Sequence, residues 1–239
     1  MTAAVSPYAG QYQLLGPSPR RDARTTAIRG DLADIALAGK LFAPHYVIPL
    51  ERALSVPHAL LRKAQGGDAE AGSELLEGER FMVLDYAGGW AWGYCAHDCY
   101  LGYFPEAVLG DPAVYPKPVY RHADPVAVAE SLLGMPYVWG GRGGAGIDCS
   151  GLMQIAFARA GYTLQRDSDQ QEASAGDLLG YEEPPRRGDL VFFTGHVGVL
   201  DDADTLIHAS QAAGMVVREP LAEVAARREG GITSRRRVL

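Results

Sequence analysis

Short apolar runs separated by glycine, proline and aspartate fill residues 46 to 109, and this pattern predicts short strands joined by turns. Several short strands in a stretch of this length are typical of a small barrel. The predicted strands are Tyr46–Leu50, Ala59–Arg62, Arg80–Asp85, Trp90–Cys95 and Leu101–Pro105. We therefore expect a small all-β unit in the first half of the chain.

Helical spacing occurs on both sides of this region. Before it, apolar residues at helical spacing predict a helix over Arg29–Lys40, with Asp31 as its cap. After it, a helix is expected over Asp124–Leu133, whose first residue can cap it and whose second, a proline, suits the first helical position. The apolar stretch Leu152–Ala160 predicts another helix.

The rest of the second half has strand patterns, and helices followed by strands indicate an α+β domain. The predicted strands are Asp189–Thr194, Gly198–Asp201, Thr205–His208, Val216–Pro220 and Ile232–Leu239. Three prolines between Asp111 and Pro118 indicate a stiff linker. The expected division is an irregular and helical segment at 1–43, the barrel at 44–111, the linker at 112–117 and the α+β domain at 118–239.

Composition narrows the possible partners. The chain has 239 residues, 47% of them hydrophobic, which is enough for a real core, and its 22 basic and 29 acidic residues give a net charge of −7. No basic cluster is interleaved with aromatic residues, so nucleic acid is not an expected partner. No stretch reaches the length needed to span a membrane. The oligomeric state stays open.

The cysteines bear on location and cofactors. Only Cys95, Cys99 and Cys149 occur, and an odd, sparse set fits a reducing compartment. The N-terminus lacks a basic start followed by an apolar run, so we expect a cytoplasmic protein. Cys95 and Cys99 are four apart, but further ligands at metal-binding spacing are too few, and we expect neither a metal nor another cofactor.

Cys149 is the strongest candidate for chemistry. It follows a run of glycines and precedes the predicted helix at 152–160, so it lies near the positive end of a helix dipole. That position is expected to lower the pKa of the thiol toward the reactive thiolate. His196 and His208 follow in strand-like settings. A thiol, a base and a group that orients the base are the parts of a cysteine acyl-transfer enzyme.

Five ordered motifs in the second half extend this interpretation. They are Pro-Tyr-Val-Trp-Gly-Gly at 136–141, Asp-Cys-Ser-Gly-Leu at 148–152, Arg-Gly-Asp-Leu-Val-Phe-Phe at 187–193, Gly-His-Val-Gly-Val at 195–199 and His-Ala at 208–209. Over residues 118–239 the chain closely resembles the NlpC/P60 family of papain-like cysteine peptidases. The resemblance implies hydrolysis of cell-wall peptides at the bond between γ-D-glutamate and a diamino acid.

The resemblance also implies a role for each site residue. Cys149 is the expected nucleophile, His196 the base and His208 the group that orients the base. Tyr137 and the Cys149 backbone N–H are expected to stabilise the oxyanion. Asp148 matches a family aspartate that holds the substrate amine or the local loop, and its neighbour Ser150 is a further candidate for substrate binding.

The barrel region resembles a bacterial SH3 domain in three stretches, 76–84, Gly-Trp-Ala-Trp at 89–92 and 100–105. Where such a domain precedes an NlpC/P60 domain, the resemblance places Asp167 and Ser168 in the substrate groove. It also implies that Glu79 and Tyr100 hold the free amine of an N-terminal L-alanine. The alternative for Glu79 is a solvated turn residue.

These expectations lead to one preferred function and three alternatives. The preferred function is a cytoplasmic cysteine peptidase that recycles murein peptides such as L-Ala-γ-D-Glu-meso-diaminopimelate. The fold expected with it is α+β, a papain-like NlpC/P60 catalytic domain preceded by a small all-β SH3-like barrel. The alternatives are an exported hydrolase of the intact wall, a catalytically silent wall-binding protein, and an enzyme that transfers the acyl group to an amine.

Overall fold

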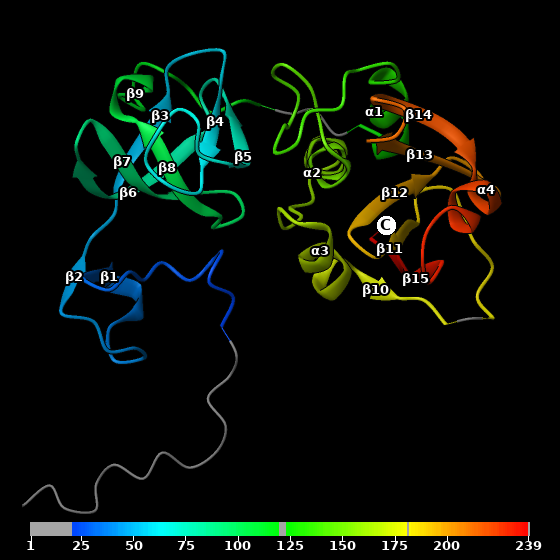
Figure 1. Cartoon of the computed structure of the whole chain (residues 1–239), viewed down its shortest axis with the longest axis horizontal. Coiled ribbons are helices and arrows are strands. Elements are labelled where there is room, and N and C mark those ends of the chain that lie inside the picture. Colours follow the sequence, from blue (N-terminus) through cyan, green and yellow to red (C-terminus); the bar gives the residue numbers. More distant parts are fainter. Residues whose placement is uncertain (1–20, 120–122, 181, 239) are drawn as a thin grey trace, which may run out of the picture.

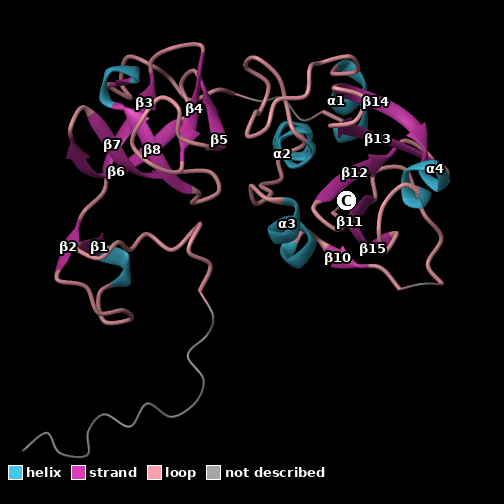
Figure 2. Ribbon diagram, in the orientation of Figure 1, coloured by secondary structure: helices cyan, strands magenta, loops and turns pink. Residues whose placement is uncertain are grey.

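The computed structural model describes residues 21–119, 123–180 and 182–238. They form two domains that lie side by side, one built of strands and the other of helices and strands (Figures 1 and 2). A segment at 21–47 lies beside the strand-rich domain (Figure 1). Within the described ranges, no helix has the length and apolar character needed to cross a bilayer.

The first domain is an antiparallel sheet of seven strands in the order β5-β4-β8-β7-β6-β3-β9. Its strands are β3 (Leu50–Leu54), β4 (His58–Arg62), β5 (Ala71–Leu76), β6 (Arg80–Ala87), β7 (Trp90–Cys95), β8 (Leu101–Pro105) and β9 (Leu109–Gly110). Phe81 and Phe104 pack edge to face at its centre, with ring centroids 4.9 Å apart. The all-β expectation is confirmed, although β5 and β9 were not predicted and the strand predicted at Tyr46–Leu50 reaches only the first residue of β3.

The helix predicted over Arg29–Lys40 is wrong. This stretch forms β1 (Leu32–Asp34), which pairs in parallel with β2 (His45–Val47), and one 3-10 turn (Ile35–Leu37). The turn is capped by Asp34, whose side chain accepts a hydrogen bond from the Ala36 N–H, and not by Asp31. Leu32 packs against Trp92 of the barrel, so contact with the barrel overrides the local helical spacing.

The predicted linker is held against the barrel. The Arg80 guanidinium donates hydrogen bonds to the carbonyl oxygens of Pro112 and Tyr115 at 3.0 and 2.7 Å. The same group pairs with Glu51 at 2.9 Å. The chain therefore leaves the barrel along a fixed path at least as far as Tyr115.

The second domain has a mixed fold, as predicted. Its sheet is antiparallel in the order β10-β15-β11-β12-β13-β14, and α1 and α2 pack on it (Figure 1). The strands are β10 (Asp177–Leu178), β11 (Leu190–Phe193), β12 (His196–Leu200), β13 (Thr205–Ser210), β14 (Met215–Pro220) and β15 (Ile232–Arg237). The helices are α1 (Pro125–Ser131), α2 (Cys149–Arg159), α3 (Ser168–Ser174) and α4 (Leu221–Ala226).

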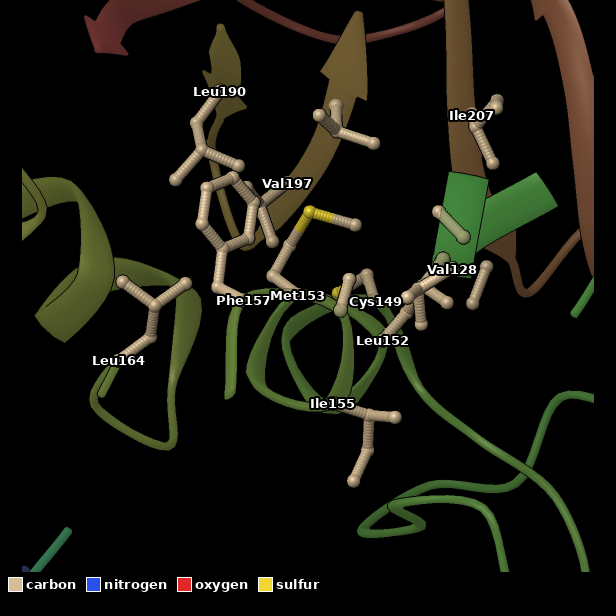
Figure 3. Packing of buried hydrophobic residues seen from close by; sticks show 14 of the residues in the cluster. Val128, Cys149, Leu152, Met153, Ile155, Phe157, Leu164, Leu190, Val197 and Ile207 are labelled. Carbon is tan, nitrogen blue, oxygen red and sulfur yellow. The ribbon is translucent and has the colours of Figure 1, made fainter. Parts of the chain in front are cut away.

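Helix α2 is the central element of this domain. Its first nine residues are all buried, and its apolar side chains pack on Leu190, Val197 and Ile207 of the sheet (Figure 3). The helix begins at Cys149, three residues before the predicted start, because Asp148 caps it by accepting a hydrogen bond from the Gly151 N–H at 2.8 Å. Burial on all sides fixes the position of the helix start, and with it that of Cys149.

A buried ion pair joins the two domains. Arg142, in the loop before α2, donates hydrogen bonds to both carboxylate oxygens of Glu79, at 2.6 and 3.1 Å. Its side chain is 2% exposed, and it also donates to the Glu74 carbonyl oxygen at 2.9 Å. Because Glu74 and Glu79 belong to the barrel, this pair fixes the barrel against the loop that carries Cys149.

Candidate active site

Cys149 is buried at the N-terminus of α2. Burial and the nearby Asp148 raise the pKa of its thiol to about 11, while hydrogen bonds from the backbone N–H groups of Val197 and Ser150 act in the opposite direction. The expected lowering of this pKa by the helix dipole is therefore wrong for the free protein, because desolvation outweighs the dipole. The resting group is a thiol that needs a base.

Three polar groups form a line in the sheet beside Cys149. Nε2 of His196, the first residue of β12, is 2.8 Å from Nδ1 of His208 on β13. Nε2 of His208 is 2.9 Å from a carboxylate oxygen of Glu219 on β14. Burial is the main cause that lowers the pKa of both histidines, so both rings are neutral at pH 7. His196 Nδ1 takes no part in the contact with His208, which is made by Nε2.

Both carboxylate oxygens of Asp148 accept hydrogen bonds from groups within the protein. Its two oxygens accept hydrogen bonds from the Arg166 guanidinium at 3.0 and 2.6 Å, from the Gly140 N–H at 2.9 Å and from the Gly151 N–H at 2.8 Å. Arg166 is 1% exposed and also donates to Ser150 Oγ at 2.8 Å. Of the two roles expected for Asp148, these contacts provide the second, holding the local loop.

The glycines before Cys149 shape this loop. Gly140 has a φ of +80° where its N–H reaches Asp148. A Cβ at Gly151 would lie 2.3 Å from the carbonyl oxygen of Gly141. The run of glycines therefore lets the backbone of the loop pack directly on the start of α2.

A cavity of about 690 Å³ opens beside Cys149 and lies between the two domains. Tyr100 from the barrel and Asp167 from the second domain meet in its wall, where the tyrosine hydroxyl donates to the Asp167 carboxylate at 3.0 Å. The lining residues that were expected from the sequence are Tyr100, Asp148, Cys149, Ser150, Asp167 and Ser168.

Comparison with known proteins agrees with this geometry. Residues 134–229 match the model of the NlpC/P60 family, and residues 61–109 match that of the bacterial dipeptidyl-peptidase SH3 domain. The chain therefore contains an NlpC/P60 domain and a bacterial SH3 domain. The strand-rich unit is accordingly its SH3 domain, and the mixed unit its NlpC/P60 domain.

Two curated relatives illustrate the match. The chain is 36% identical over 95 residues to the gamma-D-glutamyl-L-lysine dipeptidyl-peptidase of Bacillus subtilis, which covers 36% of this chain and 31% of that protein. It is 35% identical over 107 residues to a probable endopeptidase of Corynebacterium glutamicum, which covers 43% of this chain and 50% of that protein. The matched part of the chain thus spans 31% and 50% of the lengths of these two relatives.

A solved structure shows that the fold extends across both domains. The crystal structure of an NlpC/P60 family protein from Bacillus cereus superposes with a TM-score of 0.67 at 18% identity. The match covers 80% of this chain and all of that one. Because the second domain makes up about half of the chain, a match of this extent includes residues of both domains.

The structure corrects the role expected for Glu79. Its carboxylate is bound by Arg142 and accepts a hydrogen bond from the Leu76 N–H at 3.0 Å, and it is not among the residues that line the cavity. Although burial acts in the opposite direction, Arg142 keeps the pKa of Glu79 below its ordinary value. Glu79 therefore joins the domains and is neither a solvated turn residue nor placed to hold a substrate amine.

The 21–47 segment contributes residues that the sequence did not point to. Arg24 donates hydrogen bonds to Asp167 at 2.8 Å, to Asp169 at 2.8 and 2.9 Å, and to Asp22 at 2.7 to 3.1 Å. The Arg24 carbonyl oxygen accepts from the Leu101 N–H at 2.8 Å. Arg24 thus connects both domains, and it forms part of the cavity wall at Asp167.

Tyr137 lies close enough to Cys149 for the two groups to interact electrostatically. Burial raises the pKa of its phenol, and the nearby Cys149 acts in the same direction. The hydroxyl is therefore protonated at neutral pH and can donate a hydrogen bond. Its backbone N–H donates to the Gly214 carbonyl oxygen at 2.8 Å, which fixes the main chain at this position.

Proposed function

We propose that this protein is a cysteine peptidase that hydrolyses the γ-D-glutamyl–diamino acid bond of cell-wall peptides with a free N-terminal L-alanine. The observation that carries the proposal is the composition of the cavity. Cys149 and Asp167 both line it. Asp167 accepts hydrogen bonds from Arg24 and from Tyr100 of the SH3 domain. A peptide whose N-terminal amine binds at Asp167 would extend along the cavity and present its γ-D-glutamyl carbonyl to Cys149.

The chemistry follows from the line of polar groups. The Cys149 sulfur attacks the γ-carbonyl carbon of D-glutamate while its proton passes to His196 Nδ1. The oxyanion is stabilised by the Cys149 N–H, at the positive end of α2, and by the Tyr137 hydroxyl. His196 returns the proton to the leaving amine as the C–N bond breaks, and the thioester that remains is hydrolysed by water, with His196 again as the base.

Charge at the Asp167 end favours an ammonium group. Asp22, Asp167 and Asp169 face only one cation there, Arg24, among the described residues that contact them. Burial raises the pKa of Asp167 even though Arg166, Tyr100 and Arg24 act in the opposite direction, so this carboxylate is incompletely compensated. A substrate ammonium would supply the missing positive charge and form a charge-assisted hydrogen bond.

The comparisons support a peptidase that removes two residues. One relative is named a gamma-D-glutamyl-L-lysine dipeptidyl-peptidase, and the SH3 model is named for bacterial dipeptidyl-peptidases. The proposed setting is the recycling of murein peptides in the cytoplasm. The three cysteines are free thiols, which is consistent with a reducing compartment.

Mass spectrometry of digests tests the proposal. L-Ala-γ-D-Glu-meso-diaminopimelate and its L-lysine counterpart are incubated with the protein, each with a free or an acetylated N-terminus, and Cys149→Ala is the inactive control. Release of L-Ala-D-Glu from the free peptides only is expected. Efficient release of peptides from intact sacculi would favour the exported hydrolase. Binding without any cleavage would favour the silent wall-binding protein, and amide products formed with an added amine would favour acyl transfer.

A further inference from the structure

A carboxylate forms the far end of the catalytic line, the row of hydrogen-bonded side chains His196, His208 and Glu219. Glu219 lies on β14 two residues from Val217, the register partner of His208, and one of its oxygens is 2.9 Å from His208 Nε2. The same oxygen accepts a hydrogen bond from Arg227 at 2.8 Å. We propose that Glu219 is a positioning residue that fixes which ring nitrogens of His208 and His196 carry hydrogen. The inference rests on the proposed peptidase chemistry.

The Glu219 carboxylate determines which ring nitrogen of His208 carries the hydrogen. Although burial acts in the opposite direction, hydrogen bonds from Arg227 and His208 lower the pKa of Glu219, so its carboxylate is ionised and can only accept. His208 Nε2 must therefore carry a hydrogen. A neutral imidazole carries one hydrogen, so His208 Nδ1 is an acceptor.

The same logic then sets the catalytic base. His196 Nε2, 2.8 Å from the acceptor Nδ1 of His208, must donate its hydrogen there. The neutral His196 ring has no second hydrogen, and its Nδ1 keeps a lone pair for the Cys149 proton. One carboxylate thus selects the tautomers of two histidines. The carboxylate itself takes no proton in the reaction.

The surrounding charges give Glu219 a second effect. Arg227 and Arg228, at the end of α4, both lower the pKa of His208, and Arg228 also lowers that of His196. Glu219 acts on His208 in the opposite direction. Because His196 becomes an imidazolium when it takes the Cys149 proton, an anion at the far end of the line offsets the two arginines.

Glu219 also has a structural contact, and the test must separate the two roles. Its pairing with Arg227 connects β14 to the end of α4. Arg227→Gln breaks this connection but leaves the carboxylate beside His208. Arg218→Gln is a matched control on the same strand, because Arg218 pairs with Asp201 instead. Glu219→Gln keeps the size of the side chain but offers His208 an N–H as well as an oxygen.

Kinetics give the first readout. Glu219→Gln is expected to lower kcat by roughly 10-fold to 100-fold with little change in KM, as for other partners that orient a histidine. Glu219→Asp should recover part of the loss. Arg218→Gln should stay within about threefold of the wild type, and Arg227→Gln should lose less activity than Glu219→Gln because it keeps the carboxylate beside His208. An equal loss in Arg227→Gln and Glu219→Gln, with an equal drop in Tm, would reduce Glu219 to a structural contact and overturn the inference.

Two further readouts need no substrate, so they separate failure of this inference from failure of the proposed function. In ¹⁵N spectra of histidine-labelled protein, both His196 and His208 should be Nε2–H tautomers, and Glu219→Gln should convert His208 at least partly to Nδ1–H. Alkylation of Cys149 by iodoacetamide should slow in Glu219→Gln relative to the exposed Cys99. Unchanged tautomers and an unchanged alkylation rate in Glu219→Gln would refute the inference.

Discussion

Replacing Glu79 by alanine removes one partner of the buried pair between the domains. Arg142 would keep its hydrogen bonds to the Glu74 carbonyl oxygen and to Gln154, but its charge would lose the only carboxylate that its guanidinium contacts within the described residues. Breaking a buried pair by removing one partner costs about 3–5 kcal/mol, because the other charge stays buried. For a chain of this size, each kcal/mol shifts Tm by about 2–4 °C, which gives an expected drop of roughly 6–20 °C.

Glu79→Gln is the companion variant, because it keeps the shape of the side chain and an oxygen for Arg142. Unfolding is followed by circular dichroism during heating and in urea, and kcat/KM is measured on free and N-acetylated peptides with the folded protein at 25 °C. The preference for the free peptide should stay unchanged in Glu79→Gln, since Glu79 does not line the cavity. A Glu79→Ala protein with wild-type stability and a selective loss of the free peptide would refute the structural role.

Three other predictions concern the cavity and the catalytic line. Asp167→Asn should lower kcat/KM for the free peptide by about 100-fold, as expected for truncating a buried charge pair, and leave that for the acetylated peptide nearly unchanged. Arg228→Met removes a cation that lowers the pKa of His196, so the acidic limb of the kcat/KM profile should move to higher pH. Because burial lowers the pKa of His196, the unfolded chain binds a proton at this residue at a higher pH than the folded protein does. Lowering the pH therefore destabilises the folded protein. Between about pH 7.5 and about pH 5.5 the wild type should lose about 1.4 kcal/mol more stability in urea melts than His196→Gln; equal losses would count against a buried neutral ring.

The candidate catalytic residues could be named from the sequence because each lies in a strongly patterned element. Cys149 opens a buried helix, and His196 and His208 lie on consecutive strands, so local motifs and their order predict all three. Glu219 was missed although its strand was predicted. The antiparallel register of β13 and β14 places it diagonally across from His208, and a hairpin alignment of the two strands would have pointed to it.

Other features depend on contacts that local patterns do not contain. Arg24 reaches Asp167 across 143 positions of the chain, and the apolar residues around Leu32 pack on the barrel instead of forming a helix. Glu79 was assigned from its place in a motif, but the turn between β5 and β6 directs its carboxylate to Arg142. The pKa of the Cys149 thiol is likewise raised by burial, which depends on how the domain packs around it. An argument from the helix dipole alone does not include this effect.

The Asp167 end of the cavity is assembled from three parts of the chain. Tyr100 comes from the SH3 domain, Asp167 precedes α3 of the NlpC/P60 domain, and Arg24 comes from the 21–47 segment. Asp167 is held in place because its N–H donates to the Gln170 side chain at 3.1 Å, and Gln170 in turn donates to Asp22 at 2.9 Å. The catalytic line, by contrast, lies within one domain. The proposed function therefore assigns bond cleavage to the NlpC/P60 domain and the choice of substrate length to the place where all three parts meet.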